Sequence, residues 1–405
     1  MGAPDNTVLI VGAGQAGGQT ARALAAQPYP GRIVICGDEA HPPYERPPLS
    51  KGVLKGASAH RDVYLWPDEE WAAAGIEVIL ADGVIDVDYT DGTARLQSGK
   101  TIPFGTLVIA TGGRSRQLAL PGACHCLHLR DLDDSRTLNA ALTSAETIAV
   151  IGGGVIGMEI AAAAREMAKA VTVIEAGPRV MSRVLSPAAS EWLAQLHRTA
   201  GIEILTGCDV RDISPHGHGF AVTLTDRTIT ADIVVSAVGM SPNTRLAPPG
   251  SIGAMGGIVT DAEGRVTGFE NVFAIGDVAE TWNALYGRAV RLETWRNADK
   301  QARAVAKTIA GTPTAHSETP WMWTDQLGHN IQVVGMWNDT FSEVAKGEFG
   351  ESGSTLLWMR DGTIVGGVLL DNGRERRFLE QLVARATPLD DTRLADPSVK
   401  IKDLA

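Results

Sequence analysis

Two copies of one glycine pattern, at 12–17 and 152–157, constrain the fold of this chain more than any other feature. Each copy has the spacing G-x-G-x-x-G, follows a short β-branched run and precedes a helix-like segment. In such a unit the first glycine makes a tight turn, the second lets the backbone approach a pyrophosphate, and the third lets the helix pack on the strand. The glycines are Gly12, Gly14 and Gly17 in the first copy, and Gly152, Gly154 and Gly157 in the second.

An acidic residue ends the second strand of each unit. Asp38 stands 21 positions after Gly17, and Glu175 stands 18 positions after Gly157. About 20 positions separate the pattern from an acid that binds a ribose hydroxyl. Two complete units predict two bound dinucleotides. The simplest pair that fits them is FAD and a nicotinamide nucleotide. A carboxylate at the second ribose favours NADH, since it would repel a 2′-phosphate.

The remaining segments predict an α/β chain. Segments 83–104 and 210–230 alternate like antiparallel meanders inserted in each dinucleotide-binding unit. After about residue 318, strand-like pieces and a last helix predict a C-terminal α+β domain. We therefore expect two Rossmann-like dinucleotide-binding domains followed by that smaller domain.

Composition narrows the class of protein. The net charge of −11 argues against binding nucleic acid through the overall field. With 44% hydrophobic residues the chain is globular rather than disordered. We find no run of about 18–20 apolar residues and no basic N-terminal region of a signal peptide. Four cysteines are too few for a disulfide scaffold, so we expect a reduced, cytoplasmic, soluble enzyme.

The chain resembles the FAD-dependent ferredoxin reductases of bacterial oxygenase systems, which serve Rieske dioxygenases and soluble haem monooxygenases, putidaredoxin reductase among them. The resemblance covers the whole chain. Its motifs are GAGQAG, PPYERPPLSK, ATGGRSRQL, GGGVIGMEIA, AIGDVA, VRLETWRNA and PWMWTDQ, of which the PPLSK and ETW boxes are the more specific. The implied fold is that of glutathione reductase. The implied domains are 1–115 with 245–318 for FAD, 116–244 for NAD(H), and 319–405.

The resemblance also implies the residues of each site. Lys51, Glu159 and Trp295 would act at the flavin and nicotinamide rings. Residues that would hold FAD are Gly12, Gly14, Ala16, Gly17, Asp38, Arg46, Lys51, Val84, Ala110, Thr111, Gly112, Arg130, Asp277 and Trp295. Residues that would line the NAD site are Gly152, Gly154, Ile156, Gly157, Glu159, Glu175, Arg183 and Gly239. No metal site is implied.

Charge gives a physical reason for two of these assignments. A cation near the reactive ring nitrogen of a flavin stabilises the anionic reduced form. A buried lysine needs a carboxylate partner, which Glu159 on the first turn of the second helix could supply to Lys51. The alternative is that each is a solvated surface charge. Arg179 and Arg183 follow Glu175 closely, so we expect NADH as the main donor with some use of NADPH.

Cysteine placement argues against a disulfide relay. Relatives that reduce disulfides need a C-x-x-x-x-C pair after the second strand of the FAD unit, where this chain reads HPPYERPPLSK. Cys36 lies within a strand, and the pair Cys124 and Cys126 has spacing atypical for zinc. Electrons should therefore leave the flavin directly for a one-electron carrier, which the resemblance identifies as a 2Fe-2S ferredoxin.

A basic segment offers a docking surface for an acidic carrier. Residues 287–307 hold six cations against two carboxylates, so the window carries +4 in a chain of −11. The docking candidates are Arg288, Arg291, Arg296, Lys300 and Arg303, with Arg374, Arg376 and Arg377 as a second cluster. An ordinary charged helix face is the alternative.

Three other functions fit the same fold. They are a rubredoxin reductase, an NADH oxidase and a redox-sensing flavoprotein. Turnover that depends on added ferredoxin would distinguish a ferredoxin reductase from all three. Monomer and homodimer are both compatible with the sequence.

Overall fold

The computed structural model describes residues 6–386, 388, 394, 396 and 399–404. The chain forms two compact units, and each is discontinuous in sequence. Unit 1 comprises Met1–Arg46, His60–Arg114 and Met240–Glu318, and unit 2 comprises Pro47–Ala59, Ser115–Gly239 and Thr319–Ala405. The division into three domains stays a prediction.

Unit 1 is built on a parallel sheet with strand order β18-β7-β1-β2-β3. The sheet strands are β1 (Val8–Val11), β2 (Ile33–Cys36), β3 (Ile76–Ile79), β7 (Thr106–Ile109) and β18 (Val272–Ala274). The helices are α1 (Gln15–Ala25), α2 (Asp68–Ala73) and α6 (Trp295–Ile309), with the 3-10 turns η2 (His60–Val63) and η4 (Gly276–Val278). Two further small sheets are β4 (Val84–Asp88), β5 (Thr93–Leu96) and β6 (Thr101–Pro103), and β17 (Ile258–Thr260), β19 (Ala279–Asn283) and β20 (Arg288–Val290).

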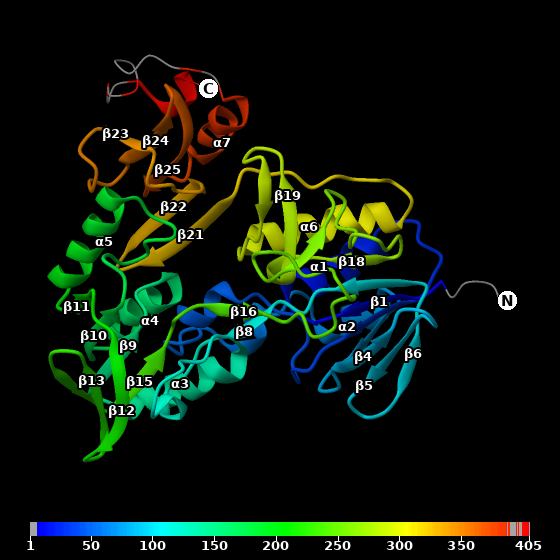
Figure 1. Cartoon of the computed structure of the whole chain (residues 1–405), viewed down its shortest axis with the longest axis horizontal. Helices are drawn as coiled ribbons and strands as arrows, with labels where there is room; N and C mark the ends of the chain where they lie inside the picture. Colours follow the sequence, from blue (N-terminus) through cyan, green and yellow to red (C-terminus); the bar gives the residue numbers. More distant parts are fainter. Residues whose placement is uncertain (1–5, 387, 389–393, 395, 397–398, 405) are drawn as a thin grey trace. The chain divides into compact units, whose positions relative to one another are not determined.

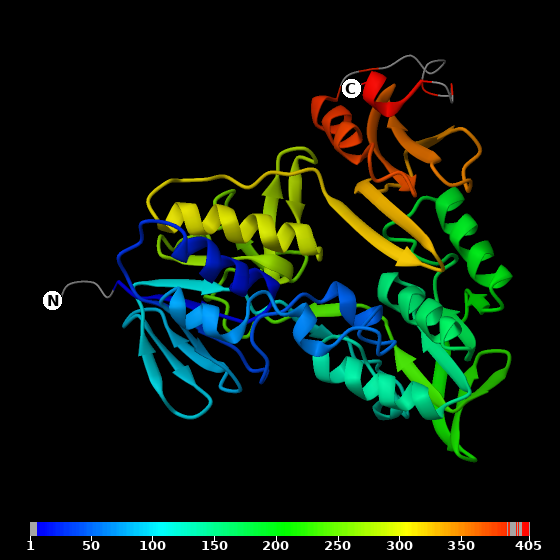
Figure 2. The same cartoon turned by 180° about the vertical axis from the view of Figure 1, so that it is seen from behind.

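Alternation along β1 places the core of unit 1 on both sides of the sheet. Val8 and Ile10 pack with apolar residues of α1 and α6. Leu9 and Val11 pack with the meander β4–β6 on the opposite face. Because successive side chains of a strand point to opposite faces, a strand covered on both sides is apolar throughout. Figures 1 and 2 show α1 and α6 side by side.

Unit 2 repeats this plan and adds a C-terminal sheet. Its parallel sheet has the order β11-β10-β9-β15. The elements are η1 (Pro47–Ser50), η3 (Ala123–His125), α3 (Leu132–Ser144), β9 (Thr147–Ile151), α4 (Val155–Glu166), β10 (Ala170–Glu175), α5 (Pro187–Thr199), β11 (Glu203–Thr206), β12 (Val210–His216), β13 (Gly219–Leu224), β14 (Thr228–Ala231) and β15 (Ile233–Ser236). A short ribbon of β8 (Gly113–Ser115) and β16 (Met240–Pro242) lies where the chain changes units.

The C-terminal segment forms an antiparallel sheet with order β21-β22-β25-β24-β23, as expected for an α+β region. Its elements are β21 (Trp321–Gln326), β22 (His329–Gly335), β23 (Ser342–Lys346), β24 (Thr355–Arg360), β25 (Thr363–Leu370), α7 (Arg376–Arg385) and η5 (Ile401–Asp403). Ile331 and Trp358 of this sheet share a core with Met158 of α4 and Leu193 of α5. Met322 of β21 packs against the same core, so this strand belongs to the unit that holds the second glycine pattern.

Candidate functional site

The first glycine loop has the shape of a phosphate cradle. Gly12 has φ +110°, and a Cβ there would lie 2.3 Å from the carbonyl oxygen of Ala110. A Cβ on Gly17 would lie 1.9 Å from the carbonyl oxygen of Gly12, so the helix α1 needs this glycine to pack. By contrast, the nearest atom to a Cβ on Gly14 is an Arg46 nitrogen at 3.9 Å. The loop therefore leaves room over its second glycine, in front of the unpaired N–H groups of α1, for a pyrophosphate.

The acids after β2 take different positions. Asp38 is exposed, and a Cβ on Gly83 would lie 3.0 Å from its Cβ, so Val84 follows a residue that approaches Asp38. The roles of both residues at the adenosine end stay predictions. Glu39 instead accepts hydrogen bonds from the hydroxyl of Tyr44 and from Arg46, the latter at 2.7 Å. Sequence reasoning missed this pair. Its function is local: it fixes the guanidinium of Arg46 near the glycine loop.

The loop after β7 is held in place across unit 1. The Thr111 hydroxyl donates to the backbone oxygen of Asn243 at 2.7 Å, and the Asn243 amide donates to the backbone oxygen of Thr111 at 3.0 Å. The backbone N–H of Asn243 also donates to Gly112. Ala110, the neighbour of this loop, contacts Gly12 as described above. The structure thus brings together the ATGG motif and the first cradle.

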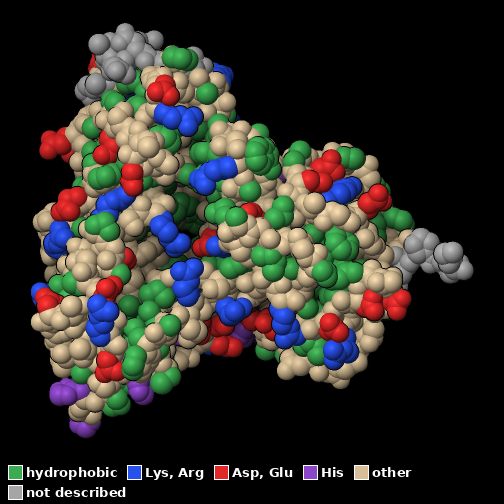
Figure 3. All heavy atoms as spheres, in the orientation of Figure 1, with side chains coloured by type: hydrophobic (Ala, Val, Ile, Leu, Met, Phe, Trp, Pro, Cys, Tyr) green, Lys and Arg blue, Asp and Glu red, His purple; other side chains and the backbone are tan. Residues whose placement is uncertain are grey.

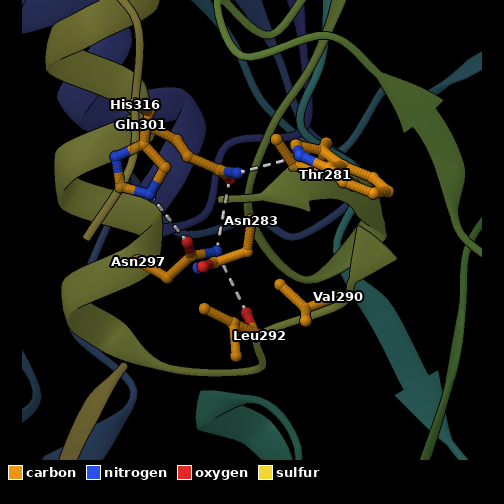
Figure 4. Close-up of a pocket in the computed structure, with 9 residues that line it drawn as sticks. Thr281, Asn283, Val290, Leu292, Asn297, Gln301 and His316 are labelled. Carbon is orange, nitrogen blue, oxygen red and sulfur yellow. Dashed lines mark hydrogen bonds between the residues drawn. The ribbon is translucent and has the colours of Figure 1, made fainter. Parts of the chain in front are cut away.

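A buried network of polar side chains from α6 and β19, drawn in Figure 4, lies behind the turn that carries Asp277. A Cβ on Gly276 would lie 3.0 Å from Ala16, so the turn η4 lies against the start of α1. Gln301 on α6 accepts the Gly276 N–H at 2.7 Å and donates to Thr281 at 3.2 Å. The small pocket drawn in Figure 4 is lined by Ala279, Thr281, Trp282, Asn283, Val290, Leu292, Asn297, Gln301 and His316.

Two further side chains of this pocket fix the first turn of α6. Asn297 donates to Gln301 at 3.3 Å and to the Leu292 carbonyl at 3.1 Å, and its own oxygen lies 3.1 Å from His316. Burial lowers the pKa of His316, so the ring is neutral near pH 7. Sequence reasoning missed Asn297, Gln301 and His316, although the i,i+4 spacing of the first two on α6 was a readable signal.

Trp295 begins α6 behind the N-cap residue Thr294, which accepts from the Asn297 N–H at 3.3 Å. The indole of Trp295 lies close to the carboxyl group of Glu45. Burial raises the pKa of Glu45, and the polar N–H of the nearby Trp295 opposes that shift. The half-buried indole therefore lies at the start of α6, beside Glu45.

The second glycine loop repeats the geometry of the first in unit 2. Gly152 has φ +104°, and a Cβ there would lie 2.5 Å from the Ala237 oxygen. A Cβ on Gly157 would lie 2.0 Å from the oxygen of Gly152, whereas one on Gly154 would have nothing within 4 Å. Ile156, on the first turn of α4, is 42% exposed. An open second glycine next to an exposed apolar side chain fits a second dinucleotide.

Glu175 at the end of β10 braces this loop. Its carboxylate accepts from Gly153 N–H at 2.6 Å and from Gly177 N–H at 2.7 Å. Of the two arginines that could attract a 2′-phosphate, Arg179 donates to the Leu185 carbonyl and lies 3.5 Å from Asp339. Arg183 instead reaches Gly239, with a nitrogen 3.5 Å from where a Cβ would be. The carboxylate thus faces the loop while only Arg183 points toward Gly239.

Lys51 and Glu159 form the ion pair that their types predict. The Lys51 Nζ lies 2.9 Å from Oε1 of Glu159, and the two side chains are 21% and 4% exposed. Ser50 donates to the other carboxylate oxygen, and Thr324 on β21 donates to Oε1 at 2.6 Å. The alternative of two solvated charges does not describe unit 2. Sequence reasoning missed Ser50 and Thr324.

Arg130 also lies in unit 2, immediately before α3. Its backbone N–H donates to the side chain of Asp134 at 2.8 Å, within the capping box that Asp131 and Asp134 form at the start of that helix. The residues predicted for FAD therefore divide between the units, with Lys51 and Arg130 in unit 2 and the others in unit 1.

The predicted docking cations are less free than the sequence window suggests. Four of the five are paired with carboxylates: Arg291 with Glu293 at 2.6 Å, Arg296 with Glu318 at 3.0 Å, Lys300 with Glu318 at 3.4 Å, and Arg303 with Asp299 at 2.9 Å. Glu318 lies outside the window 287–307, so counting charge over the window overstated the local positive charge. Arg291 is only 11% exposed, whereas Lys300 and Arg303 are 45% and 56% exposed. Within the described part of the chain the exposed Arg288 forms no ion pair.

In the second basic cluster, Arg376 lies over the ring of Trp321 at 4.6 Å and pairs with Glu380 at 3.0 Å. Arg374 and Arg377 are exposed. This leaves two exposed cations on unit 2 as the second docking candidate.

The cysteines are free thiols, and Cys36 and Cys126 are buried. Burial raises the pKa of Cys36 to about 12 and that of Cys126 to about 11, so both stay protonated and unreactive. Histidines gather on the part of unit 2 around the β12–β13 hairpin (Figure 3), where His216 and His218 are exposed. No cluster of three or more potential metal ligands occurs among the described residues. None of the described helices has the length and apolar character needed to cross a membrane.

Comparison with known proteins identifies the family that shares these features. Residues 6–302 match the family model for pyridine nucleotide-disulphide oxidoreductases, and residues 321–405 match that for the reductase C-terminal domain. The chain is 35% identical to the ferredoxin–NAD(+) reductase subunit of a benzene 1,2-dioxygenase system from Pseudomonas putida, over 98% of this chain and 97% of that protein.

Two solved structures agree over nearly the whole chain. A ferredoxin reductase from Rhodopseudomonas palustris superposes with a TM-score of 0.94 at 34% identity, covering 99% of this chain and 100% of that one. The covalent putidaredoxin reductase–putidaredoxin complex gives a TM-score of 0.93 at 29% identity, covering 99% and 98%.

Proposed function

This chain belongs to the pyridine nucleotide-disulphide oxidoreductases with a reductase C-terminal domain, and from that premise we propose that it is a ferredoxin–NAD(+) reductase. It would take hydride from NADH into bound FAD and pass single electrons to a 2Fe-2S ferredoxin. The ferredoxin would in turn feed a bacterial oxygenase in the cytoplasm, an aromatic-ring dioxygenase by analogy with the relatives.

The observation that carries the proposal is the pair of matching cradles. Each unit holds one, and in each the second glycine alone has open space. Gly14, Arg46 and Asp277 would hold FAD, together with Asp38 at the adenosine ribose. Gly154, Ile156 and Glu175 would hold NADH. Bound FAD accepts two electrons as a hydride and releases them one at a time.

Side chains of this protein would orient the two ligands and place charged groups next to them. We assign Lys51 and Glu159 to the flavin and nicotinamide rings, where the ammonium supplies positive charge and the carboxylate can bind an amide. Trp295, which begins α6 beside Glu45, would provide an aromatic face for the rings. Glu175 already accepts two N–H groups, so its oxygens are fixed where they favour a ribose hydroxyl over a phosphate.

The test is cytochrome c reduction by the purified holoenzyme with NADH, with and without an added 2Fe-2S ferredoxin. We expect a rate that depends on ferredoxin and is lower with NADPH. Flavin that is reduced by NADH but gives no ferredoxin-dependent rate with either Rieske-type or plant-type ferredoxins would overturn the assigned acceptor. Rapid NADH consumption with oxygen alone would instead identify an oxidase.

A further inference from the structure

A chain of buried hydrogen bonds runs behind the Lys51–Glu159 pair, and the function proposed above does not use it. Thr324 donates to Glu159 at 2.6 Å. Gln326, two residues along β21, donates to Thr324 at 2.9 Å, and its oxygen lies 2.8 Å from Nε2 of His197 on α5. All of these partners belong to unit 2.

The chemistry of the groups fixes the direction of every bond. An ionised carboxylate only accepts hydrogen bonds, so the Thr324 hydroxyl donates its one proton to Glu159. Gln326 must then present its amide nitrogen to Thr324 and its oxygen to the imidazole. His197 in turn carries its proton on Nε2. The three bonds therefore all donate toward the carboxylate.

Burying these polar side chains costs free energy of folding unless each is hydrogen-bonded. Thr324 and His197 are fully buried, and Gln326 is 2% exposed. Nδ1 of His197 has no hydrogen-bond partner among the described residues. Burial lowers the pKa of His197 to about 4, so the ring stays neutral. A neutral imidazole joined through an amide does not relay protons, which leaves orientation as the function of the chain.

We propose that Thr324, Gln326 and His197 are positioning residues that hold the Glu159 carboxylate, and through it Lys51, in the geometry needed for flavin reduction by NADH. The inference rests on the proposed function. On this proposal, strand β21 of the C-terminal segment contributes to the reduction of the flavin by NADH. Because Gln326 and His197 act only through Thr324, their loss should add little once the threonine hydroxyl is gone.

The experiment is anaerobic stopped-flow reduction of the FAD holoenzyme by NADH, followed by flavin absorbance. Thr324→Val keeps the shape of the side chain and removes the donor. We expect the limiting rate of reduction to fall about tenfold, the scale of one lost hydrogen bond to a charged group. Thr324→Ser should restore it. Asp325→Asn, on the exposed face of the same strand, is the matched control and should match wild type.

The series arrangement gives a second readout. Gln326→Met alone should slow reduction less than Thr324→Val, and the double variant should be no slower than Thr324→Val alone. A wild-type limiting rate in Thr324→Val, equal losses in the valine and serine variants, or additive losses in the double variant would each overturn the proposal. If the wild-type flavin itself is not reduced by NADH, the proposed function fails instead. FAD content and circular dichroism confirm that each variant is folded.

Discussion

Single residues carry most of what is specific in the two cradles. Glycines were predictable because each has a fixed place in a contiguous pattern, and in both loops the structure crowds the first and third glycine and leaves the second open. Glu39, Ser50 and Thr324 were not predictable, because the first competes with an adjacent acid and the others bond a residue more than 100 positions away. No local periodicity encodes such a contact.

Glu175 gives a prediction about coenzyme choice. Replacing it with alanine removes a negative charge and the acceptor of the Gly153 N–H. We expect the ratio of kcat/KM for NADH to that for NADPH to fall about tenfold, because one charge-assisted bond is worth roughly 1.5–3 kcal/mol. Steady-state kinetics with both coenzymes measures it. Glu203→Ala, an exposed acid on β11, is the control, and an unchanged ratio in Glu175→Ala would refute the assignment.

His197 predicts how stability depends on pH. Its folded pKa of about 4 lies below the ordinary 6.5, so the unfolded chain binds one more proton between these values. Its contribution to stability is present above pH 6.5 and is lost as pH falls toward 4, by up to about 1.4 kcal/mol per pH unit. The melting temperature of wild type should therefore exceed that of His197→Gln by more at pH 7.5 than at pH 5. An equal difference at the two pH values would contradict the buried neutral ring.

At the scale of elements, the parallel strands and the helices after each glycine loop followed from sequence pattern. β-branched runs flanked by glycine mark buried strands, and both units confirm them. The order of the C-terminal strands, and the packing of β21 in the same core as α4, depend on contacts distant in sequence. The fold class was therefore readable, but the support that β21 gives to Glu159 was not.

Gly154 and Gly157 should respond differently to alanine. A Cβ at Gly157 would collide with the oxygen of Gly152, so α4 must move and the protein should melt several degrees lower. A Cβ at Gly154 meets open space, so stability should be unchanged while the pyrophosphate is kept away. Both variants should raise the KM for NADH and retain FAD. Calorimetry and NADH titration separate the two effects, and equal melting temperatures would count against this account of the loop.

At the scale of the whole molecule, charge is the feature that matters for a protein partner. The chain carries −11, and carboxylates pair most of the cations around α6. An acidic carrier would therefore meet chiefly Arg288, which forms no ion pair among the described residues, and the exposed but paired Lys300 and Arg303. Screening over about 10 Å at 0.1 M salt should weaken that attraction.

Charge reversal at Arg288 tests the docking surface. Arg288→Glu should raise the KM for ferredoxin about three- to tenfold, more so at low salt, because like charges then face the carrier. The rate of flavin reduction by NADH should not change. Arg95→Glu, an exposed arginine on β5 of the same unit, is the matched control. If both variants behave alike, the carrier docks elsewhere, and Arg374 and Arg377 are the next positions to reverse.

Because each unit is built from segments distant in sequence, the order of synthesis on the ribosome affects how this chain folds. β7 is complete at Ile109, but its partner β18 begins only at Val272. At about 5–20 residues per second, roughly 8–30 s pass before that edge of the sheet can be covered. An uncovered strand edge is a template for pairing with other nascent chains. Yield in the cell should therefore depend on chaperone supply and growth temperature more strongly than the stability of the finished protein would suggest.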